Sequence, residues 1–327
     1  MSRTINWGII GCGRIAAAFA EGLKSLPDAG LTAAASRTEG KAKTFCKKFF
    51  IPGCHETYDA IVNDPDVDVI YVATTHNFHF DHARLALEHG KHVLCEKAFT
   101  LNAGQAEILI ETARKHNRFL MEAMWTRFLP CTRKLLELLA GGIIGEVRLI
   151  KADLCKKFPR DPQDRFFNLN LGGGSLLDLG VYPISFAGFI FGGTPADIHS
   201  AAHIGATGVD EQAAYLLFYD GGRHAVLSSS LVAALPPDAY VTGGGGYIHV
   251  PHFTRPTRFH VYRNESQPET IEMPYESSGL NYEAAEVMRC IRAGKLESEV
   301  LPLRETLETM KMMDHIRSQW DLKYPDE

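Results

Sequence analysis

The sequence predicts a two-domain protein of the α/β class, and three observations lead to this fold. From Ile5 to about residue 122, short apolar runs alternate with amphipathic helical stretches. Beyond that point, longer strand-like runs follow one another and are joined by turn residues. With 327 residues, the chain is also longer than a single ordinary core requires. We therefore expect residues 1–122 to form a doubly wound parallel sheet, and residues 123–327 to form an α+β domain with a mostly antiparallel, open-faced sheet.

The first domain is predicted from five apolar runs that are typical of buried strands, most of them followed by a helical pattern. Strands are expected at 5–10, 31–35, 67–73, 92–95 and 118–122, and helices at 16–26, 41–50, 80–88 and 101–117. Repeated β–α units make right-handed crossovers, which place neighbouring strands parallel to one another.

The second domain is predicted from longer strands with turn signals between them. Strands are expected at 147–154, 198–204, 211–219, 224–233 and 259–262, and helices at 132–140, 175–191, 282–293 and 304–319. The Asp220-Gly221-Gly222 turn between two of these strands indicates an antiparallel hairpin. Gly243–Gly246 is interpreted as another hairpin turn, because the Lys-Ser or Lys-Thr of a phosphate-binding loop does not follow it.

Composition argues against several classes of protein. A net charge of −5 at pH 7 disfavours nucleic-acid binding, which normally needs a basic excess. The longest apolar stretch, Val181–Gly193, is shorter than the about 18–20 residues that span a bilayer, and it is predicted to be a buried helix. The N-terminus enters a strand pattern too early for a signal peptide. Seven cysteines without a CxxC pair are typical of reduced thiols, so we expect a soluble cytoplasmic protein that binds neither nucleic acid nor membrane.

A dinucleotide-binding fingerprint follows the first predicted strand, where GCGRIA at 11–16 matches GxGxxA. In this motif the first glycine makes a tight turn, the second lets the backbone approach the pyrophosphate, and the small last residue lets the helix pack closely. The pyrophosphate then binds free N–H groups at the helix N-terminus. The motif predicts a Rossmann domain whose cofactor-binding residues include Gly11, Cys12, Gly13, Arg14 and Ile15.

The end of the second predicted strand distinguishes NADP from NAD. An acidic residue there usually binds the ribose 2′-hydroxyl of NAD, whereas an arginine suits the 2′-phosphate of NADP. The chain has Ser36-Arg37-Thr38 at this point. Arg37 can make a bidentate contact with phosphate, and Ser36 or Thr38 can add a hydroxyl. NADP is therefore the expected cofactor, and NAD is less favoured.

Four further motifs resemble those of one family. ATTHNFH at 73–79 and GKHVLCEKA at 90–98 resemble the ATPNxxH and GKHVxCEKP signatures of the glucose–fructose oxidoreductase/inositol dehydrogenase/MocA (Gfo/Idh/MocA) family. MEAMWTRF at 121–128 and GGGSLLDLGVYP at 172–183 are most similar to its dimeric dihydrodiol dehydrogenase branch. The resemblance covers essentially the whole chain and implies an oxidoreductase that transfers hydride.

The resemblance also implies roles for individual residues. Lys97 stands at the catalytic lysine that contacts nicotinamide, and Glu96 stands near the nicotinamide ribose. Asp178 and Tyr182 stand at the substrate-orienting aspartate and the catalytic tyrosine. Trp125 fits a wall of the substrate pocket and a core position equally well. The segment that borders the cofactor is expected to contribute Tyr71, Thr74, Thr75, His76 and His79.

Two positions depart from the family pattern. Ala98 replaces the usual proline after Glu-Lys, and because a cis bond costs more before alanine than before proline, the sequence leaves the backbone conformation open there. Tyr182 replaces the histidine of most family members, which moves the acid–base chemistry from an imidazole to a phenol.

The candidate catalytic residues have complementary chemistry. A phenol, with a pKa of about 10, is a poor base at neutral pH unless a cation stabilises the phenolate. Lys97 can supply this cation and polarise the substrate oxygen. Asp178 and Tyr182 are spaced i,i+4, so both side chains lie on one face of an α-helix. Without the resemblance, a core tyrosine and an aspartate that interacts with the helix dipole would be the simpler interpretations.

The expected function is hydride transfer between NADP(H) and a secondary alcohol or carbonyl of a sugar, polyol or cyclic vicinal diol. A non-catalytic NADP-binding sensor and a reductase of a larger ligand remain open alternatives. The histidines at 76, 79 and 82 lack the spacing of a known metal motif, so no metal is expected. Strands 211–219 and 224–233 carry apolar or small residues on both faces, which predicts a homodimer or higher homo-oligomer formed through the sheet. Helices covering both faces would explain this pattern equally well.

Overall fold

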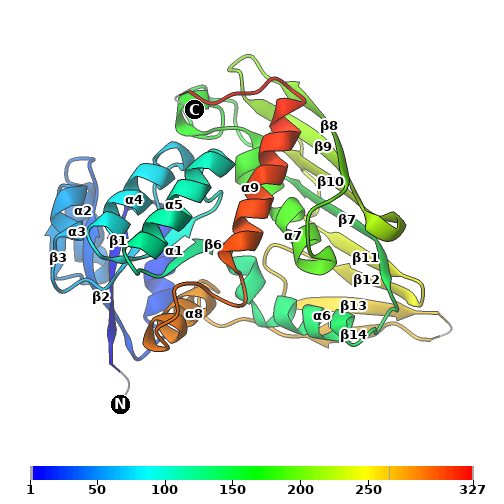
Figure 1. Ribbon diagram of the computed structural model, residues 1–327, viewed down its shortest axis with the longest axis horizontal. Coiled ribbons are helices and arrows are strands. Elements are labelled where there is room, and N and C mark those ends of the chain that lie inside the picture. Colours follow the sequence, from blue (N-terminus) through cyan, green and yellow to red (C-terminus); the bar gives the residue numbers. More distant parts are fainter. Residues whose placement is uncertain (1–2, 265, 326–327) are drawn as a thin grey trace. The chain divides into compact units, whose positions relative to one another are not determined.

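The computed structural model describes residues 3–264 and 266–325 (Figure 1). The chain divides into two compact units, and each is described by itself. The first unit consists of the residues up to Thr100, Gly104–Trp125 and Glu276–Thr306. The second consists of Leu101–Ala103, Thr126–Tyr275 and the residues from Leu307 onward.

The first unit is built on a six-stranded sheet in the order β3-β2-β1-β4-β5-β6, and all its strand pairs are parallel. Its strands are β1 (Ile5–Ile10), β2 (Ala29–Ala35), β3 (Gly53–His55), β4 (Val69–Val72), β5 (His92–Glu96) and β6 (Leu120–Ala123). Its helices are α1 (Arg14–Leu23), α2 (Lys41–Phe49), α3 (Tyr58–Val62), α4 (His79–Glu88), α5 (Ala103–Lys115) and α8 (Asn281–Arg292). This is the predicted doubly wound sheet, with β3 and α3 as elements that the sequence pattern did not predict.

Buried aromatic rings join the first helix to the middle of this sheet. Trp7 of β1, Phe19 of α1 and Tyr71 of β4 are all fully buried. The rings of Phe19 and Tyr71 stack with centroids 3.8 Å apart, and Trp7 meets Phe19 edge-on at 5.1 Å. Such rings bury a large apolar area each, so they fix α1 over β1 and β4.

The second unit is built on an eight-stranded sheet in the order β14-β13-β12-β11-β7-β10-β9-β8. Its strands are β7 (Val147–Cys155), β8 (Asp197–Ile204), β9 (Asp210–Tyr219), β10 (Arg223–Ser230), β11 (Ala239–Gly243), β12 (Gly246–Val250), β13 (Arg258–Arg263) and β14 (Glu269–Glu272). Only the pair of β7 with β10 is parallel among the described strand pairs of this sheet, which agrees with the predicted mostly antiparallel sheet. Gly243 pairs with Gly246 at the predicted hairpin turn.

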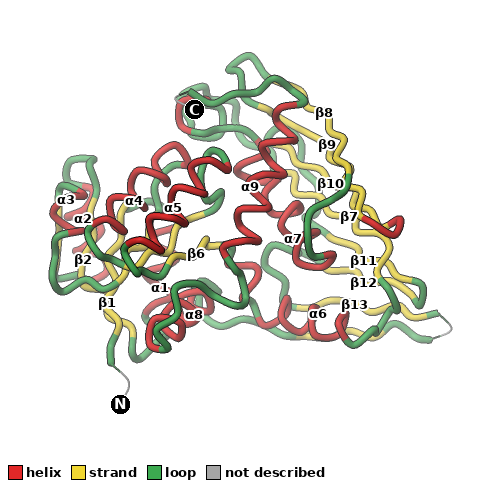
Figure 2. The backbone as a smooth tube through the Cα atoms, in the orientation of Figure 1, coloured by secondary structure: helices red, strands yellow, loops and turns green. Residues whose placement is uncertain are grey.

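One face of this second sheet is packed and the other is open. Figure 2 shows α7 (Val181–Phe191) beside the strands, and α7 contacts β7 and β10 while α6 (Pro130–Ala140) contacts β13. The last helix is α9 (Leu303–Ser318). Along β9, buried residues alternate with exposed ones, including Leu216 and Phe218. The sequence did not resolve the two faces, because small and apolar residues occupy both.

The segment 276–306 belongs to the first unit, whereas the division predicted at residue 122 places it in the second. α8 packs on α1, and the turn before α8 comes so close that a Cβ at Gly22 would lie 2.7 Å from Ser278 Oγ. The Ser277 hydroxyl donates to Glu21 O at 3.3 Å, and Arg292 donates to Arg3 O at 3.0 Å. These contacts join residues more than 250 positions apart, which local sequence patterns do not reveal.

Within the described residues, Leu169–Phe191 is the one helical segment long and apolar enough to cross a membrane. It is longer than the apolar stretch expected from the sequence, because helical residues before Val181 extend it. However, 78% of its apolar window is buried inside the protein. Core helices pass the same test of length and composition.

Candidate cofactor and catalytic site

A tight turn at the end of β1 begins the candidate site. Gly11 has a φ of 94°, and a Cβ added there would lie 2.7 Å from Ala73 O at the end of β4. The Gly11 N–H donates to Ala35 O at 3.0 Å, which joins the turn to the end of β2. Only glycine fits this combination of positive φ and close backbone approach.

The N-terminus of α1 leaves space for an anion. Gly13 is its N-cap and no side chain caps the helix. A Cβ at Gly13 would meet no protein atom within 4 Å, so the absence of a side chain keeps open a space that the protein does not fill. Arg14 and Ile15 are exposed and Ala16 is fully buried, as the fingerprint requires. Unpaired N–H groups at such a helix start suit the pyrophosphate of a dinucleotide.

Arg37 lies exposed just after β2 and stacks on aromatic rings. Its guanidinium is 4.2 Å from the centroid of Phe78 and 5.5 Å from that of Tyr58. Within residues 3–264 and 266–325 no carboxylate pairs with it. Ser36 is buried, and its hydroxyl accepts from the Thr38 N–H at 3.2 Å. The result is a positive charge that is held in place by stacking and not neutralised by a neighbour.

The ends of β4 and β5 position Glu96 and Lys97. The buried Tyr71 hydroxyl donates to the Glu96 carboxylate, and the Lys97 N–H donates to the same carboxylate at 3.2 Å. Lys97 itself is half-buried, and its peptide bond with Ala98 is cis. Tyr71, proposed on sequence as a cofactor residue, therefore contacts Glu96 and is itself fully buried in the sheet.

The segment after β4 holds its histidines by hydrogen bonds. His79 Nδ1 lies 2.8 Å from Ala98 O, and His82 Nδ1 lies 3.1 Å from Thr74 Oγ1. His76 is buried with its ring 5.5 Å from that of His79, and the Thr75 hydroxyl donates to the Asn77 side chain at 2.7 Å. Among the described residues no group of three metal-ligating side chains is assembled. His79 thus joins α4 to the segment that carries Lys97.

Asp178 and Tyr182 lie at the start of the apolar helix in the second unit. Residues Leu176–Gly180 form a π-helical turn, and α7 begins at Val181. The regular α-helix predicted over 175–191 is therefore wrong in its first turn, where i→i+5 bonding replaces i→i+4. Asp178 is buried and accepts from Arg165 at 2.9 Å, while Tyr182 is half-buried.

Asp210 supports this helix and was not predicted from the sequence. Its carboxylate accepts from the Ser175 hydroxyl at 2.8 Å and from the Leu176 N–H at 2.7 Å. Tyr215, Ser229 and Ser175 continue the network through hydroxyls 2.6 and 2.9 Å apart. Burial raises the pKa of Asp210 to about 7. No local motif marks Asp210, because its partner precedes it by about 35 positions and meets it only in the fold.

Two further buried carboxyls lie near Glu96 in the first unit. Glu122 of β6 accepts from the Thr306 hydroxyl at 3.1 Å, and burial raises its pKa to about 7. Glu283 of α8 is fully buried, and neither of its oxygens has a hydrogen-bond partner within the described part of the chain. Burial, with the nearby Glu96 and Glu122, raises the pKa of Glu283 well above its usual range.

Two family models match this chain. Residues 5–124 match the oxidoreductase family with the NAD-binding Rossmann fold, and residues 132–249 match the GFO/IDH/MocA C-terminal domain. Together the matches cover more than half of the chain.

Relatives match over nearly the full length. The chain is 38% identical to trans-1,2-dihydrobenzene-1,2-diol dehydrogenase from Xenopus tropicalis, over 98% of this chain and 99% of that protein. It is 34% identical to the D-xylose 1-dehydrogenase (NADP⁺) from Hypocrea jecorina, over 99% and 94%. A 3-ketoreductase from Actinomadura kijaniata, solved with NADP and TDP-benzene, superimposes with a TM-score of 0.85 at 30% identity and covers 97% and 98%.

Glu122→Gln should remove a pH dependence of stability. The folded pKa of about 7 exceeds the ordinary 4.5, so the stabilising contribution of this carboxyl is complete below about pH 4.5 and is lost as the pH rises through 7. Between pH 5 and pH 8, the unfolding free energy of wild type should fall by about 3 kcal/mol more than that of the variant. Urea denaturation at both values measures this. The exposed Glu111→Gln serves as the control, and equal slopes for wild type and Glu122→Gln would contradict the assignment.

Proposed function

The chain belongs to the Gfo/Idh/MocA oxidoreductase family, and we propose that it is an NADP(H)-dependent dehydrogenase acting on a secondary hydroxyl of a cyclic vicinal diol, polyol or sugar. The observation that carries the substrate class is the full-length similarity to a dihydrodiol dehydrogenase and to a D-xylose dehydrogenase. Both relatives oxidise hydroxyl groups by name. A panel of sugars and trans-dihydrodiols, assayed with NADP⁺ and NAD⁺ by absorbance, tests the proposal directly.

Arg37 supports NADP as the cofactor. The dinucleotide pyrophosphate would bind at Gly11–Ile15, and the 2′-phosphate would bind Arg37 with help from Ser36 or Thr38. The guanidinium is already stacked on Phe78 and has no carboxylate partner in the described chain, so little ordering is needed when a phosphate binds. When bound, NADP(H) supplies or accepts the hydride at nicotinamide C4.

The protein's own groups would handle the proton. We assign Tyr182 to exchange the proton of the substrate hydroxyl, Lys97 to stabilise the phenolate and the substrate oxygen, and Asp178 to orient the substrate. The Glu96 carboxylate accepts from the backbone N–H of Lys97 and would border the nicotinamide ribose. Arg165 pairs with the buried Asp178, so this carboxylate is not left as an unpaired buried charge.

We also infer a homodimer formed through the open face of the second sheet, in a protein that works in the cytoplasm with its seven cysteines as free thiols. Five large side chains on this sheet are between 37% and 40% exposed: Leu216, Phe218, Val226, Tyr240 and Tyr247. Exposed apolar side chains gathered on one sheet face often mark an interface, and C2 pairing is the commonest way to cover such a face.

Arg37→Ala should raise the KM for NADP⁺ by one to two orders of magnitude, since a lost charged hydrogen bond costs about 1.5–3 kcal/mol. The KM for NAD⁺ should be nearly unchanged, because NAD⁺ lacks the 2′-phosphate. Steady-state kinetics with both cofactors measures the effect, and Lys43→Ala on the exposed side of α2 controls for a general loss of positive charge. Equal damage with both cofactors would show that Arg37 does not bind the 2′-phosphate.

Tyr182→Phe removes only a hydroxyl and should lower kcat by about 10²–10⁴-fold while NADPH affinity, followed by fluorescence, is retained. Lys97→Met should be at least as damaging and should also weaken NADPH binding. Asp178→Asn should chiefly raise the substrate KM, with a smaller effect on kcat. A near-wild-type kcat for Tyr182→Phe would mean that another group or water carries the proton.

Phe218→Asp should convert the dimer to a monomer, because it places a charge among the exposed apolar side chains of the proposed interface. Light scattering at micromolar concentration measures the mass. Ile108→Asp, on a helix of the first unit and 45% exposed, is the matched control and should stay dimeric. A monomeric wild-type protein would contradict the proposed interface.

A further inference from the structure

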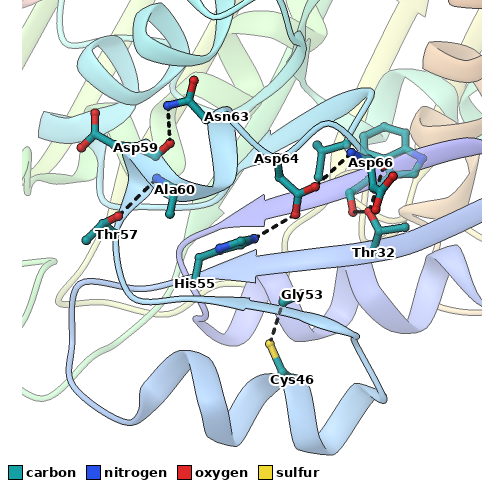
Figure 3. A network of polar contacts seen from close by, with 12 residues as sticks. Thr32, Cys46, Gly53, His55, Thr57, Asp59, Ala60, Asn63, Asp64 and Asp66 are labelled. Carbon is teal, nitrogen blue, oxygen red and sulfur yellow. Dashed lines mark hydrogen bonds and ion pairs between the residues drawn. The ribbon is translucent and has the colours of Figure 1, made fainter.

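Two cysteines of the first unit lie next to each other on elements that pack together. Cys46 is on α2, and Cys54 directly follows Gly53 on β3, the strand that α2 contacts. Figure 3 shows the Cys46 side chain reaching from its helix to the strand, where its thiol donates to Gly53 O at 3.6 Å. The neighbourhood of the two thiols is therefore fixed by the α2–β3 contact.

The connection between α2 and β3 is a short turn. α2 ends at Phe49, Phe50 adopts a φ of 58°, and the Ile51 N–H returns to Cys46 O at 3.0 Å. β3 then pairs with β2, with Cys54 opposite Ala34. A short, hydrogen-bonded turn therefore joins the two elements that carry the cysteines.

The two thiols differ in access to solvent. Cys54 is exposed, whereas Cys46 is 5% exposed. Burial, together with Cys54, raises the pKa of Cys46 to about 12, so Cys46 stays a thiol at neutral pH. An exposed thiol is open to an oxidant, and a second cysteine next to it can condense with the sulfenic acid that forms.

We propose that Cys46 and Cys54 form an oxidation site, separate from the cofactor and catalytic residues, in which a hydroperoxide oxidises Cys54 and Cys46 resolves it to a reversible disulfide. In the first step Cys54 sulfur takes the distal oxygen of the hydroperoxide, giving a sulfenic acid and releasing the alcohol, or water when the oxidant is hydrogen peroxide. In the second step the Cys46 sulfur forms the S–S bond, and the sulfenic hydroxyl leaves as water with the Cys46 proton. Two thiols are oxidised by two electrons and one peroxide O–O bond is reduced.

Cys12 is the competing partner. It lies in the glycine turn, is 8% exposed and interacts electrostatically with Cys54. Its thiol donates to Ala35 O of β2 at 3.5 Å, whereas the Cys46 thiol contacts β3 itself, at Gly53 next to Cys54. Cys46 is therefore the expected partner.

Peptide mapping after treatment with hydrogen peroxide tests the site. Lys47 and Lys48 separate the two cysteines, and Arg14 ends the peptide that carries Cys12, so trypsin places all three on different peptides. Wild type should yield a linked Cys46–Cys54 pair that dithiothreitol releases, with little labelling by dimedone, a sulfenic-acid trap. Oxidation should also raise Tm by a few degrees, because the cross-link restricts the unfolded chain.

Single variants separate the two roles. Cys46→Ser, with Cys46→Ala as a second form in case serine disturbs the buried position, should leave Cys54 as a sulfenic acid that dimedone labels strongly. Cys54→Ser should give neither link nor label, and Cys155→Ser, on β7 of the second unit, should behave as wild type. A Cys12–Cys54 link, or dimedone labelling of wild-type Cys54 without a Cys46 link, would overturn the proposal. Catalytic activity is not a readout, so failure here and failure of the proposed dehydrogenase function are independent.

Discussion

The first unit depends on one close backbone approach, at the turn between β1 and α1. A Cβ at Gly11 would lie 2.7 Å from Ala73 O, so the turn can come this close to the end of β4 only because residue 11 is glycine. The strand order reverses between β1 and β4, and nucleotides bind at such reversals in parallel sheets. The end of β4 also starts the segment with His79, which bonds to Ala98 O beside Lys97. The Gly11 turn therefore contacts the same strand end from which His79 reaches the Glu96-Lys97 segment.

The second unit has a comparable constraint in its buried polar network. Gly174 and Gly180 carry no side chains where a Cβ would lie 2.1 Å from Asp210 Oδ1 and 2.6 Å from the Tyr215 hydroxyl. These glycines let the Asp210 network approach the helix start, and Asp210 in turn satisfies the Leu176 N–H. The glycine-rich motif before Asp178 thus has a packing reason as well as the role suggested by resemblance. The π-helical turn at Leu176–Gly180 also departs from regular α-helix geometry where the helix start meets this network.

The sequence could predict what depends on local pattern. The β–α alternation, the fingerprint and the role of Arg37 could be predicted because each is recognised from a few neighbouring residues. For strands β11 and β12 the sequence predicted the hairpin turn between them but not their bounds, since AYVTG and GYIHV are short and interrupted by polar residues and glycine. The stacking of Phe78 on Arg37 and the return of α8 to the first unit depend on contacts between distant segments. Asp210 and Glu283 carry no motif, and only their burial in the fold sets them apart from surface acids.

The buried carboxyls beneath the strand ends bear on how this unit accepts an anionic cofactor. A dinucleotide brings several negative charges to the ends of β1, β2 and β4, and ionised carboxylates nearby would repel them. Of the three buried acids, Glu96 has the donors Tyr71 and the Lys97 N–H, which favour its charged form. Glu283 has no hydrogen-bond donor among the described residues, and burial raises its pKa well above the usual range, which favours its neutral form. Burial also raises the pKa of Glu122, so the fold disfavours negative charge on the other two buried acids and favours it on Glu96, which Lys97 adjoins.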